Sequence, residues 1–310
     1  MKVISLSGSL KPLKNTCAAI GIFDGVHRGH QYLIKRMSAA ARRLHARPVV
    51  ITFFPHPAHV LQPNIRLGYL TSLHERLCLL KDLGVSLTVV VPFTRAFAAI
   101  EPERFIQHVL VKKLGVKAVF VGEDFKFGKD RKGDIALFEK LAFRYGYEIH
   151  AVPALKQGGE VISSTRIRGL IENGPLSKAA QLLGRRVFIS GRVARGSHRG
   201  KTLGFATANI DYQADILPSQ GVYIVLAYLG KKAYPALANI GTRPSFEKQV
   251  SKTHVEVYLL DFSKSIYGKH LKIEFLKKIR NEKKFSGPQQ LIRQIQKDEV
   301  VARHYFKANN

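Results

Sequence analysis

The stretch that decides the fold is Gly21-Ile22-Phe23-Asp24-Gly25-Val26-His27-Arg28-Gly29-His30. It overlaps an apolar run, residues 17–23, that has the composition of a buried strand. Apolar residues at helical spacing follow it, between Tyr32 and Leu44. The glycines and histidines of the stretch are therefore expected at a strand-to-helix turn. Backbone N–H groups and the positive end of a helix favour a phosphate at such a turn.

His27 and His30 stand three residues apart, so they share one face of the first helical turn and both can donate to phosphoryl oxygens. The segment resembles the H-x-G-H signature of nucleotidylyltransferases, enzymes in which the α-phosphate of a nucleoside triphosphate is attacked. A plain turn with a surface histidine, or half of a metal site, would be the alternatives. The apolar strand before the turn and the periodic helix after it favour the nucleotide interpretation.

Length and composition exclude several classes of protein. With 310 residues the chain is expected to form roughly two domains, and its 45% hydrophobic content is typical of globular proteins. Its apolar stretches are shorter than the roughly 20 residues of a membrane helix, and residues 1–15 lack the pattern of a signal peptide. Cys17 and Cys78 are too few for a disulfide framework and fit a reducing compartment. We therefore expect a cytoplasmic protein in which Cys17 packs as a small hydrophobe.

The formal net charge of +28 allows two interpretations. One is nucleic-acid binding through neutralised phosphates, and the other is a basic surface that attracts small anionic substrates. Lysine and arginine pairs are spread over both halves, and the sequence shows neither a basic tail nor a zinc-finger or RNP-like motif. We expect small-molecule substrates as partners, and neither a nucleic acid nor a membrane. The sequence leaves the oligomeric state open, and a homo-oligomer is one option.

Strand-like and helix-like segments alternate in the first half of the chain. The pattern predicts strands at 17–23, 49–53, 87–91, 116–121 and 147–152, and helices at 73–83, 102–114 and 135–145. Strands that alternate with helices indicate a parallel sheet with crossover helices. Ligands bind such sheets at the carboxyl ends of the strands, which is where the opening motif falls.

The pattern changes after Val152. Two short helices are predicted at 163–173 and 176–183, followed by β-rich runs at 187–193, 222–229, 233–237, 254–260 and 271–275. The spacing of these runs and their glycine-rich turns suggest a small antiparallel β-barrel. A closing helix follows, with Ser286 predicted as the N-cap of a capping box. We place the domain boundary near Gly184, which gives domains 1–184 and 185–310.

Three further motifs lie in the first half. Thr52-Phe53-Phe54-Pro55-His56-Pro57 ends the second strand, and its prolines stiffen a turn that presents His56, although a plain turn would look the same. Residues 121–128 follow another strand and carry two phenylalanines that could flank a flat aromatic ligand or belong to the core. Residues 162–168 place hydroxyls at a helix N-terminus, and their two arginines can neutralise a pyrophosphate.

In this order and spacing, the motifs G-x-F-D-G-x-H-x-G-H, T-F-x-P-H-P, V-G-E-D-F-x-F-G and S-S-T-R-I-R resemble the FMN adenylyltransferase module of bacterial bifunctional riboflavin kinase/FAD synthetases. The resemblance implies a Rossmann-like nucleotidylyltransferase sheet in which His27 and His30 contact ATP phosphates and stabilise the transition state. The other ATP- and phosphate-binding residues would be Gly21, Phe23, Asp24, Gly25, Ser163, Ser164, Thr165, Arg166 and Arg168. The flavin nucleotide would lie near His56, Asp124, Phe125 and Phe127.

The second half contains a glycine-rich run, residues 191–209, whose glycines permit close approach of the backbone to phosphate. Thr207 and Asn209 supply oxygen donors that suit Mg²⁺, and within a strand they point to the same side. A generic glycine-rich β-turn is the alternative. The run resembles the flavokinase signature G-x-V-x-x-G-x-x-x-G-x-x-x-G-F-P-T-A-N, with Ala206 in place of the proline.

The flavokinase resemblance implies further roles. The ATP of the kinase reaction would be bound by Gly196, Gly200, Lys201, Gly204, Thr207 and Asn209, of which the last two would hold Mg²⁺. Residues 238–246 resemble the family's A-N-I-G-x-R-P-T-F, with Ser245 for threonine. Glu256 would be the general base for the riboflavin 5′-hydroxyl, although an outward-facing strand glutamate is the common alternative. Arg280 matches a basic position near the kinase substrates.

We therefore predict a two-domain enzyme with ATP as co-substrate, Mg²⁺ as cofactor, and riboflavin, FMN and FAD as substrates and products. The C-terminal barrel would phosphorylate riboflavin to FMN, and the N-terminal domain would adenylylate FMN to FAD with release of pyrophosphate. Two alternatives stay open from the sequence. One is an enzyme of single activity in which the Ala206 loop belongs to a regulatory flavin-binding module, and the other is a basic RNA- or DNA-binding regulator.

Overall fold

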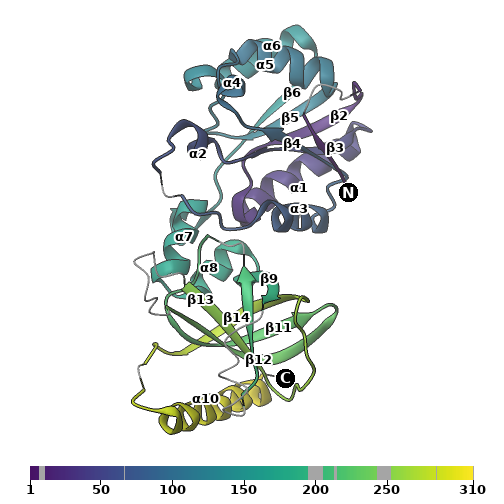
Figure 1. Cartoon of the computed structure of the whole chain (residues 1–310). Helices are drawn as coiled ribbons and strands as arrows, with labels where there is room; N and C mark the ends of the chain where they lie inside the picture. The colour runs from purple at the N-terminus through teal and green to yellow at the C-terminus, as the bar shows by residue number, and fades with distance from the viewer. Residues whose placement is uncertain are drawn as a thin grey trace. The chain divides into compact units, whose positions relative to one another are not determined.

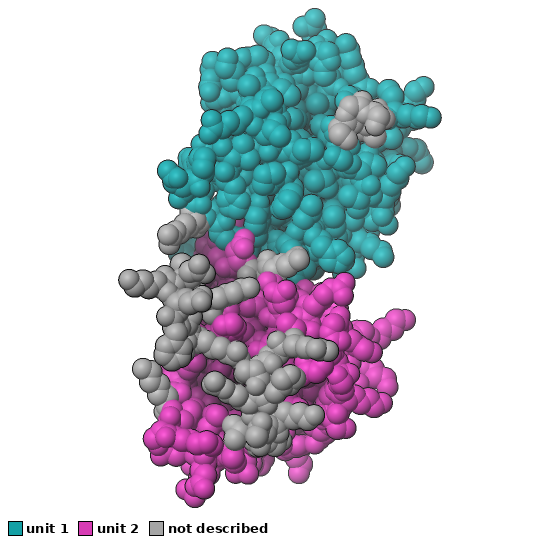
Figure 2. Space-filling view, viewed as in Figure 1, with its two compact units in different colours: residues 1–164 teal, residues 165–310 magenta. Residues whose placement is uncertain are grey.

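The computed structural model describes residues 1–6, 11–65, 67–194, 205–212, 215–242, 253–283 and 285–309 (Figure 1). The chain divides into two compact units, unit 1 (Met1–Ser164) and unit 2 (Thr165–Asn310) (Figure 2). The two short helices before the barrel belong to unit 2, apart from Ser164 at the start of the first, whereas a domain boundary near Gly184 stays a prediction. Each helix in the described ranges is too short or too polar to cross a membrane.

A six-stranded sheet with the order β1-β4-β3-β2-β5-β6 forms the centre of unit 1. Its strands are β1 (Lys2–Ser5), β2 (Thr16–Ile20), β3 (Arg47–Phe54), β4 (Leu87–Pro92), β5 (Val116–Gly122) and β6 (Glu148–Val152). Every neighbouring pair is parallel, which confirms the predicted fold class. β1 pairs with β4 at the edge of the sheet and was not predicted from the sequence.

Both faces of the sheet are buried, because successive residues of a central strand enter two separate hydrophobic clusters. In β2, Ala18 and Ile20 belong to one cluster, and Cys17 and Ala19 belong to the other. A strand that is covered on both faces reads as a continuous apolar run, which is the pattern that predicted it. Cys17 is fully buried, as predicted for a small hydrophobe, and burial raises the pKa of its thiol.

Helices cover the two faces (Figure 1). They are α1 (Arg28–Arg43), α2 (Pro57–Leu61), α3 (Leu73–Asp82), α4 (Arg95–Ala98), α5 (Pro102–Phe105) and α6 (Ile135–Tyr145), with the short turns η1 (Asp24–Val26) and η3 (Lys129–Arg131). α1 and α3 contribute Ile34 and Leu80 to one cluster, while α6 contributes Phe138 to the other. The helix predicted at 102–114 begins as α5 but continues with π-helical geometry in η2 (Ile106–Lys113). A hairpin of β7 (Lys156–Gln157) and β8 (Glu160–Val161) comes before α7.

Unit 2 contains a closed antiparallel barrel with the strand order β10-β13-β12-β11-β14-β9, which confirms the predicted barrel. Its strands are β9 (Phe188–Ala194), β10 (Thr207–Tyr212), β11 (Gly221–Leu229), β12 (Lys232–Thr242), β13 (Thr253–Leu259) and β14 (His270–Arg280). The helices α7 (Ser164–Asn173) and α8 (Leu176–Leu183) precede the barrel, and α10 (Pro288–Ala308) follows it. Ala302 of α10 packs in a cluster with Val222 and Leu237 of the barrel.

The start of α10 differs from the prediction. Its N-cap is Gly287, which makes no side-chain cap, so the capping box with Ser286 as N-cap is wrong. The backbone N–H of Ser286 instead donates to the Oε1 atom of Gln290 at 3.4 Å. Pro288 occupies the first turn, and its fixed φ angle and missing N–H suit the first helical position. The proline therefore accounts for a helix start one residue later than predicted.

Candidate active sites

The turn between β2 and α1 is held in an unusual backbone conformation. Phe23, Gly25 and Val26 have φ angles of 53°, 76° and 40°, in the left-handed region. A Cβ atom on Gly25 would come within 2.7 Å of the Leu70 side chain, so both conformation and space require glycine there. Phe23 and Val26 carry a strain of order 1 kcal/mol each, because they are not glycines. Surrounding contacts must therefore hold the turn in place.

His27 is the N-cap of α1. Its Nδ1 atom accepts a hydrogen bond from the backbone N–H of His30 at 3.4 Å, and the two rings stack with their centroids 3.6 Å apart. Because Nδ1 accepts, a neutral His27 carries its proton on Nε2 and can donate it to a phosphoryl oxygen. The structure thus brings both predicted histidines together at the N-terminus of α1, where the helix dipole favours an anion.

The carboxylate of Asp24 is buried and accepts hydrogen bonds from the backbone. It is 2% exposed, and it accepts hydrogen bonds from the backbone N–H groups of Leu70 at 3.1 Å and Thr71 at 3.2 Å. The Thr71 hydroxyl in turn accepts from the backbone N–H of Gly25 at 3.1 Å. These contacts tie the turn to the loop before α3. These contacts give Asp24 an anchoring role, and the contact with ATP that the resemblance implies for it stays a prediction.

The predicted second phosphate motif meets the turn at Ser164, whose hydroxyl donates to the backbone carbonyl of Asp24 at 3.0 Å. Ser163 and Ser164 are counted with unit 1 and are half-buried. The rest of the motif, namely Thr165, Arg166 and Arg168, is counted with unit 2. The structure therefore joins the beginning of the second motif to the first motif, and the roles of the two arginines stay predictions.

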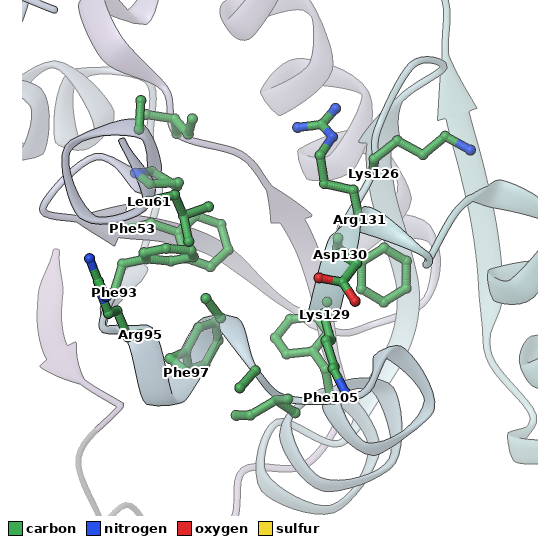
Figure 3. Close-up of a pocket in the computed structure, with 18 of the residues that line it drawn as sticks. Phe53, Leu61, Phe93, Arg95, Phe97, Phe105, Lys126, Lys129, Asp130 and Arg131 are labelled. Carbon is green, nitrogen blue, oxygen red and sulfur yellow. The ribbon is translucent and has the colours of Figure 1, made fainter. Parts of the chain in front are cut away.

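A cavity of about 860 Å³ lies at the carboxyl ends of the strands in unit 1 (Figure 3). Gly21 and Ile22, which open the histidine turn, form part of its wall. Six phenylalanines line it: Phe53, Phe93, Phe97, Phe105, Phe125 and Phe127. Ligand pockets commonly have volumes of about 300–1,000 Å³ and mostly apolar walls. The cavity thus has the size and lining expected for a flat aromatic ligand.

The structure sorts the predicted flavin-binding residues into two groups. His56, Phe125 and Phe127 line the cavity, whereas Asp124 is exposed. Phe127 also packs against Phe138 of the core with ring centroids 4.5 Å apart, which confirms its place in the core, while its contact with a flavin stays a prediction. Basic side chains line the cavity as well. Figure 3 shows Lys126, Lys129 and Arg131 on the side opposite Phe53 and Phe93, whereas Arg95 lies on the same side as Phe93.

Sequence reasoning missed the part of the cavity that follows β4. Phe93, Arg95 and Phe97 come directly after that strand, and Phe105 lies at the end of α5. The available signal was the Pro92-Phe93 pair at a strand end, which parallels Pro55 after β3. Because carboxyl ends of parallel strands meet at one edge of a sheet, aromatic residues after neighbouring strands converge there.

The barrel brings the predicted kinase residues into one row. Asn209 of β10 lies opposite Glu256 of β13, and Glu256 lies opposite Asn239 of β12. Burial alternates along these strands: the neighbours Ala208, Ala238 and Val257 are buried, while the row itself is half-buried. Thr207, two positions before Asn209, therefore shares its face of the barrel. Directly opposed residues have Cβ atoms roughly 5 Å apart, so an amide oxygen and a carboxylate can meet here.

Several predicted kinase residues lie outside the described ranges. They are Gly196, Gly200, Lys201 and Gly204 of the glycine-rich run, and Ser245 of the following motif. Ala206, which stands where the flavokinase signature has proline, is exposed and directly precedes β10. Of the predicted kinase site, the structure thus describes the row on the barrel wall.

Arg280 forms a buried ion pair with Asp298 of α10. Its Nε atom donates to the Asp298 carboxylate at 2.9 Å, its Nη2 atom lies 2.8 Å from the same group, and its Nη1 atom donates to the carbonyl of Asn281. The side chains of Arg280 and Asp298 are only 15% and 7% exposed. Gln294 donates to the same carboxylate at 2.8 Å. Arg280 therefore clamps the end of β14 to α10, and its predicted contact with a kinase substrate stays a prediction.

Comparisons with known proteins match both halves of the chain. A family model described as FAD synthetase matches residues 10–166, and a family model described as riboflavin kinase matches residues 183–306. A bifunctional riboflavin kinase/FMN adenylyltransferase of Escherichia coli strain K12 is 40% identical over 299 residues, which cover 96% of this chain and 95% of that protein. The protein of the same description from Bacillus subtilis strain 168 is 38% identical over 93% of this chain and 92% of its own.

A solved structure has the same fold over nearly the whole chain. It is described as a macrolide-efflux protein from Streptococcus pneumoniae, with 31% identity and a TM-score of 0.87, and the match covers 98% of this chain and 99% of that one. The parallel sheet with its histidine turn and the barrel with its polar row define a two-domain enzyme of nucleotide-dependent phosphate chemistry. The chain belongs to the bifunctional riboflavin kinase/FMN adenylyltransferases, and it carries an FAD synthetase domain and a riboflavin kinase domain.

Proposed function

We propose that unit 1 transfers the adenylyl group of ATP to FMN, with the flavin ring in the phenylalanine-lined cavity and the ATP phosphates at the histidine turn. The observation that carries this assignment is the position of Gly21 and Ile22, which line the cavity and also open the turn. A flavin ring among the phenylalanines would extend its phosphate toward that wall. The basic residues of the cavity favour a ligand that carries negative charge.

In this reaction a phosphate oxygen of FMN attacks the α-phosphorus of ATP. A new P–O bond forms, and the bond to the pyrophosphate leaving group breaks. A phosphate monoester has a second pKa of about 6, so FMN needs no general base near neutral pH. His27 donates from Nε2, and with His30 and the N-terminus of α1 it stabilises the charge that grows on the phosphoryl oxygens. The pyrophosphate would leave toward Ser163 and Ser164, which belong to the same unit.

We assign riboflavin phosphorylation to the row on the barrel wall. The Glu256 carboxylate takes the proton of the riboflavin 5′-hydroxyl as that oxygen attacks the γ-phosphorus of ATP, and ADP leaves. Thr207 and Asn209 fit a Mg²⁺ ion, because both are oxygen donors on the face of the barrel that carries Glu256. When bound there, Mg²⁺ would neutralise charge on the ATP phosphates. The row thus supplies both a base and ligands for the metal.

Two variants of the full chain test the assignment, with FMN and FAD separated by chromatography. His27→Asn keeps a side-chain acceptor for the cap of α1 but removes the Nε2 donor. It should lower FAD formation from FMN about 100-fold and leave FMN formation from riboflavin unchanged. Glu256→Gln should abolish FMN formation and still allow added FMN to be adenylylated. Equal loss of both activities in either variant would refute separate sites.

We also propose a cytoplasmic location. Cys17 and Cys78 are both free thiols, and Cys78 is exposed, which suits a reducing compartment. Thiol labelling of intact cells that express the chain checks this: Cys78 should be found reduced. Recovery of the chain as a Cys78-linked dimer from unstressed cells would contradict it.

A further inference from the structure

Arg76 is a fully buried charged residue in unit 1 with no role in the chemistry described so far. It lies in the first turn of α3, but its guanidinium leaves the helix. The Nη1 atom donates to the backbone carbonyl of Ile22 at 2.9 Å and lies 3.4 Å from both the Thr52 hydroxyl and the Phe53 carbonyl. One side chain thus connects the ends of the two strands, β2 and β3, that carry the motifs of the adenylyltransferase site.

The remaining contacts of Arg76 are with residues that hold the histidine turn and the His56 turn. Its Nη2 atom lies 3.8 Å from the Asp24 carboxylate, the group that anchors the histidine turn. Its guanidinium lies 5.7 Å from the centre of the Tyr69 ring, and the Tyr69 hydroxyl accepts a hydrogen bond from the backbone N–H of His56. Asp24 belongs to the turn for ATP, whereas His56 lines the cavity for the flavin. Arg76 therefore contacts an anchor of each substrate site.

A purely structural role explains these contacts poorly. Burying a guanidinium costs several kcal/mol of desolvation, and burial lowers the pKa of Arg76, opposed by Asp24. An apolar residue could fasten α3 to the sheet at no such cost, as Leu80 does one turn later. What an apolar residue cannot do is donate to polar groups at two strand ends and also lie beside a carboxylate. The Nη1 atom of Arg76 does the first, while Nη2, which like Nε makes no hydrogen bond within the described residues, lies 3.8 Å from the Asp24 carboxylate. The partners of Arg76 are thus better explained by geometry at the site than by stability.

We propose that Arg76 is a positioning residue for adenylyl transfer, which sets the placement of the histidine turn relative to the flavin cavity through Ile22, Phe53 and Asp24. This inference rests on the assignment of FMN to the cavity and of ATP to the turn. Each substrate site keeps its own residues when Arg76 changes, so binding of each substrate survives. What is lost is the alignment of the FMN phosphate with the α-phosphorus, and misplacement by about 1 Å can reduce a rate about 100-fold.

Arg76→Lys tests the proposal in the full chain, because lysine keeps the charge but has one nitrogen in place of the two that face the strand ends and Asp24. We expect kcat for FAD formation from FMN and ATP to fall about 100-fold, while KM for FMN and for ATP stays within about threefold. Retained KM values for FMN and ATP in FAD formation also show that unit 1 is folded, whereas flavin quenching would not, because unit 2 binds FMN as the product of its own reaction. A kcat within threefold of that of the unchanged protein would overturn the proposal.

Leu80→Ala on the same helix is the matched control, since it removes a buried side chain that faces the core rather than the site. It should lower the melting temperature at least as much as Arg76→Lys and keep kcat within about threefold at 25 °C. If Leu80→Ala loses as much kcat as Arg76→Lys, the effect of Arg76 is one of stability and the proposal fails. FAD formation by the unchanged protein tests the assigned function separately. If the unchanged protein does not form FAD from FMN, the assigned function fails and not only the role of Arg76.

Discussion

The imidazole ring of His27 stacks on the ring of His30, with centroids 3.6 Å apart, while its Nδ1 atom caps the backbone N–H of His30 at 3.4 Å. One histidine therefore starts α1 and also fixes the orientation of the pair. The cap commits Nδ1 to accepting, which leaves the Nε2–H of a neutral His27 as the donor for phosphate. Helix capping and phosphate recognition are thus combined in one side chain.

Gly29→Ala should impair this histidine pair without weakening α1. A Cβ atom on Gly29 would lie 3.2 Å from two ring atoms of His27, so the ring must shift. Alanine favours helices over glycine by about 1 kcal/mol, so the melting temperature should not fall. We expect a loss of about tenfold or more in FAD formation. Gly169→Ala in α7, where a Cβ atom would meet open space, is the control, and an unchanged rate for Gly29→Ala would argue against the required ring position.

Phe97→Leu should weaken flavin binding selectively. Phe97 lines the cavity and packs against Phe93 and Phe105 with ring centroids 5.8 and 6.1 Å apart. Loss of an aromatic contact of about 1 kcal/mol corresponds to a rise of roughly fivefold in KM for FMN, with KM for ATP unchanged. Steady-state kinetics measure both constants. Phe143→Leu, at a position 97% exposed on α6, serves as the control and should change neither.

Asn209→Leu should change the metal dependence of the kinase reaction. We expect the Mg²⁺ concentration for half-maximal FMN formation to rise about tenfold or more, because an oxygen ligand is lost. Chelation with EDTA should stop FMN formation by the unchanged protein. Ile210→Val, at the buried position next to Asn209, should leave the Mg²⁺ dependence as it was. An identical Mg²⁺ curve for Asn209→Leu would exclude it as a ligand.

Arg280→Gln and Asp298→Asn should behave alike. Each breaks the same buried ion pair between β14 and α10, which should cost about 3 kcal/mol of unfolding free energy in thermal or urea denaturation. Because Nε, Nη1 and Nη2 of Arg280 are engaged within the protein, we expect the same KM for riboflavin in both variants. A higher KM for Arg280→Gln alone would instead support the substrate contact that the sequence predicts.

Glu148→Gln should reduce stability in a manner that depends on pH. The hydrogen bond from His150, and then the ion pair with Arg43 at 2.7 Å, lower the pKa of the Glu148 carboxyl. A lowered folded pKa stabilises the protein above the unfolded value of about 4.3, and the gain is lost as the pH falls through the folded value. Urea unfolding of both proteins should therefore differ at pH 5.5 and converge near pH 3. A difference that persists at pH 3 would point to lost contacts rather than charge.

Much of the secondary structure could be predicted from the sequence, because burial leaves a local periodic signal. The prediction for 135–145 coincides with α6, and β3 extends the predicted 49–53 by a few residues at its ends. β1 was missed because it is a short, mostly exposed edge strand whose partner β4 is remote in the chain. The capping box at Ser286 failed because a proline two residues later set the helix start.

By itself the sequence determined that the histidine turn and the His56 turn follow buried strands, and that residues alternate between two faces around Glu256. The tertiary structure was needed to show that the Asp24 carboxylate accepts hydrogen bonds from Leu70 and Thr71. It was also needed to show that Phe97 and Phe53 line the same cavity. Only strand register placed Glu256 opposite Asn209. The physical reason is that hydrophobic periodicity reflects which side chains of a helix or strand are buried and which are exposed to water. Contacts between distant segments depend on strand order and register, which no local pattern specifies.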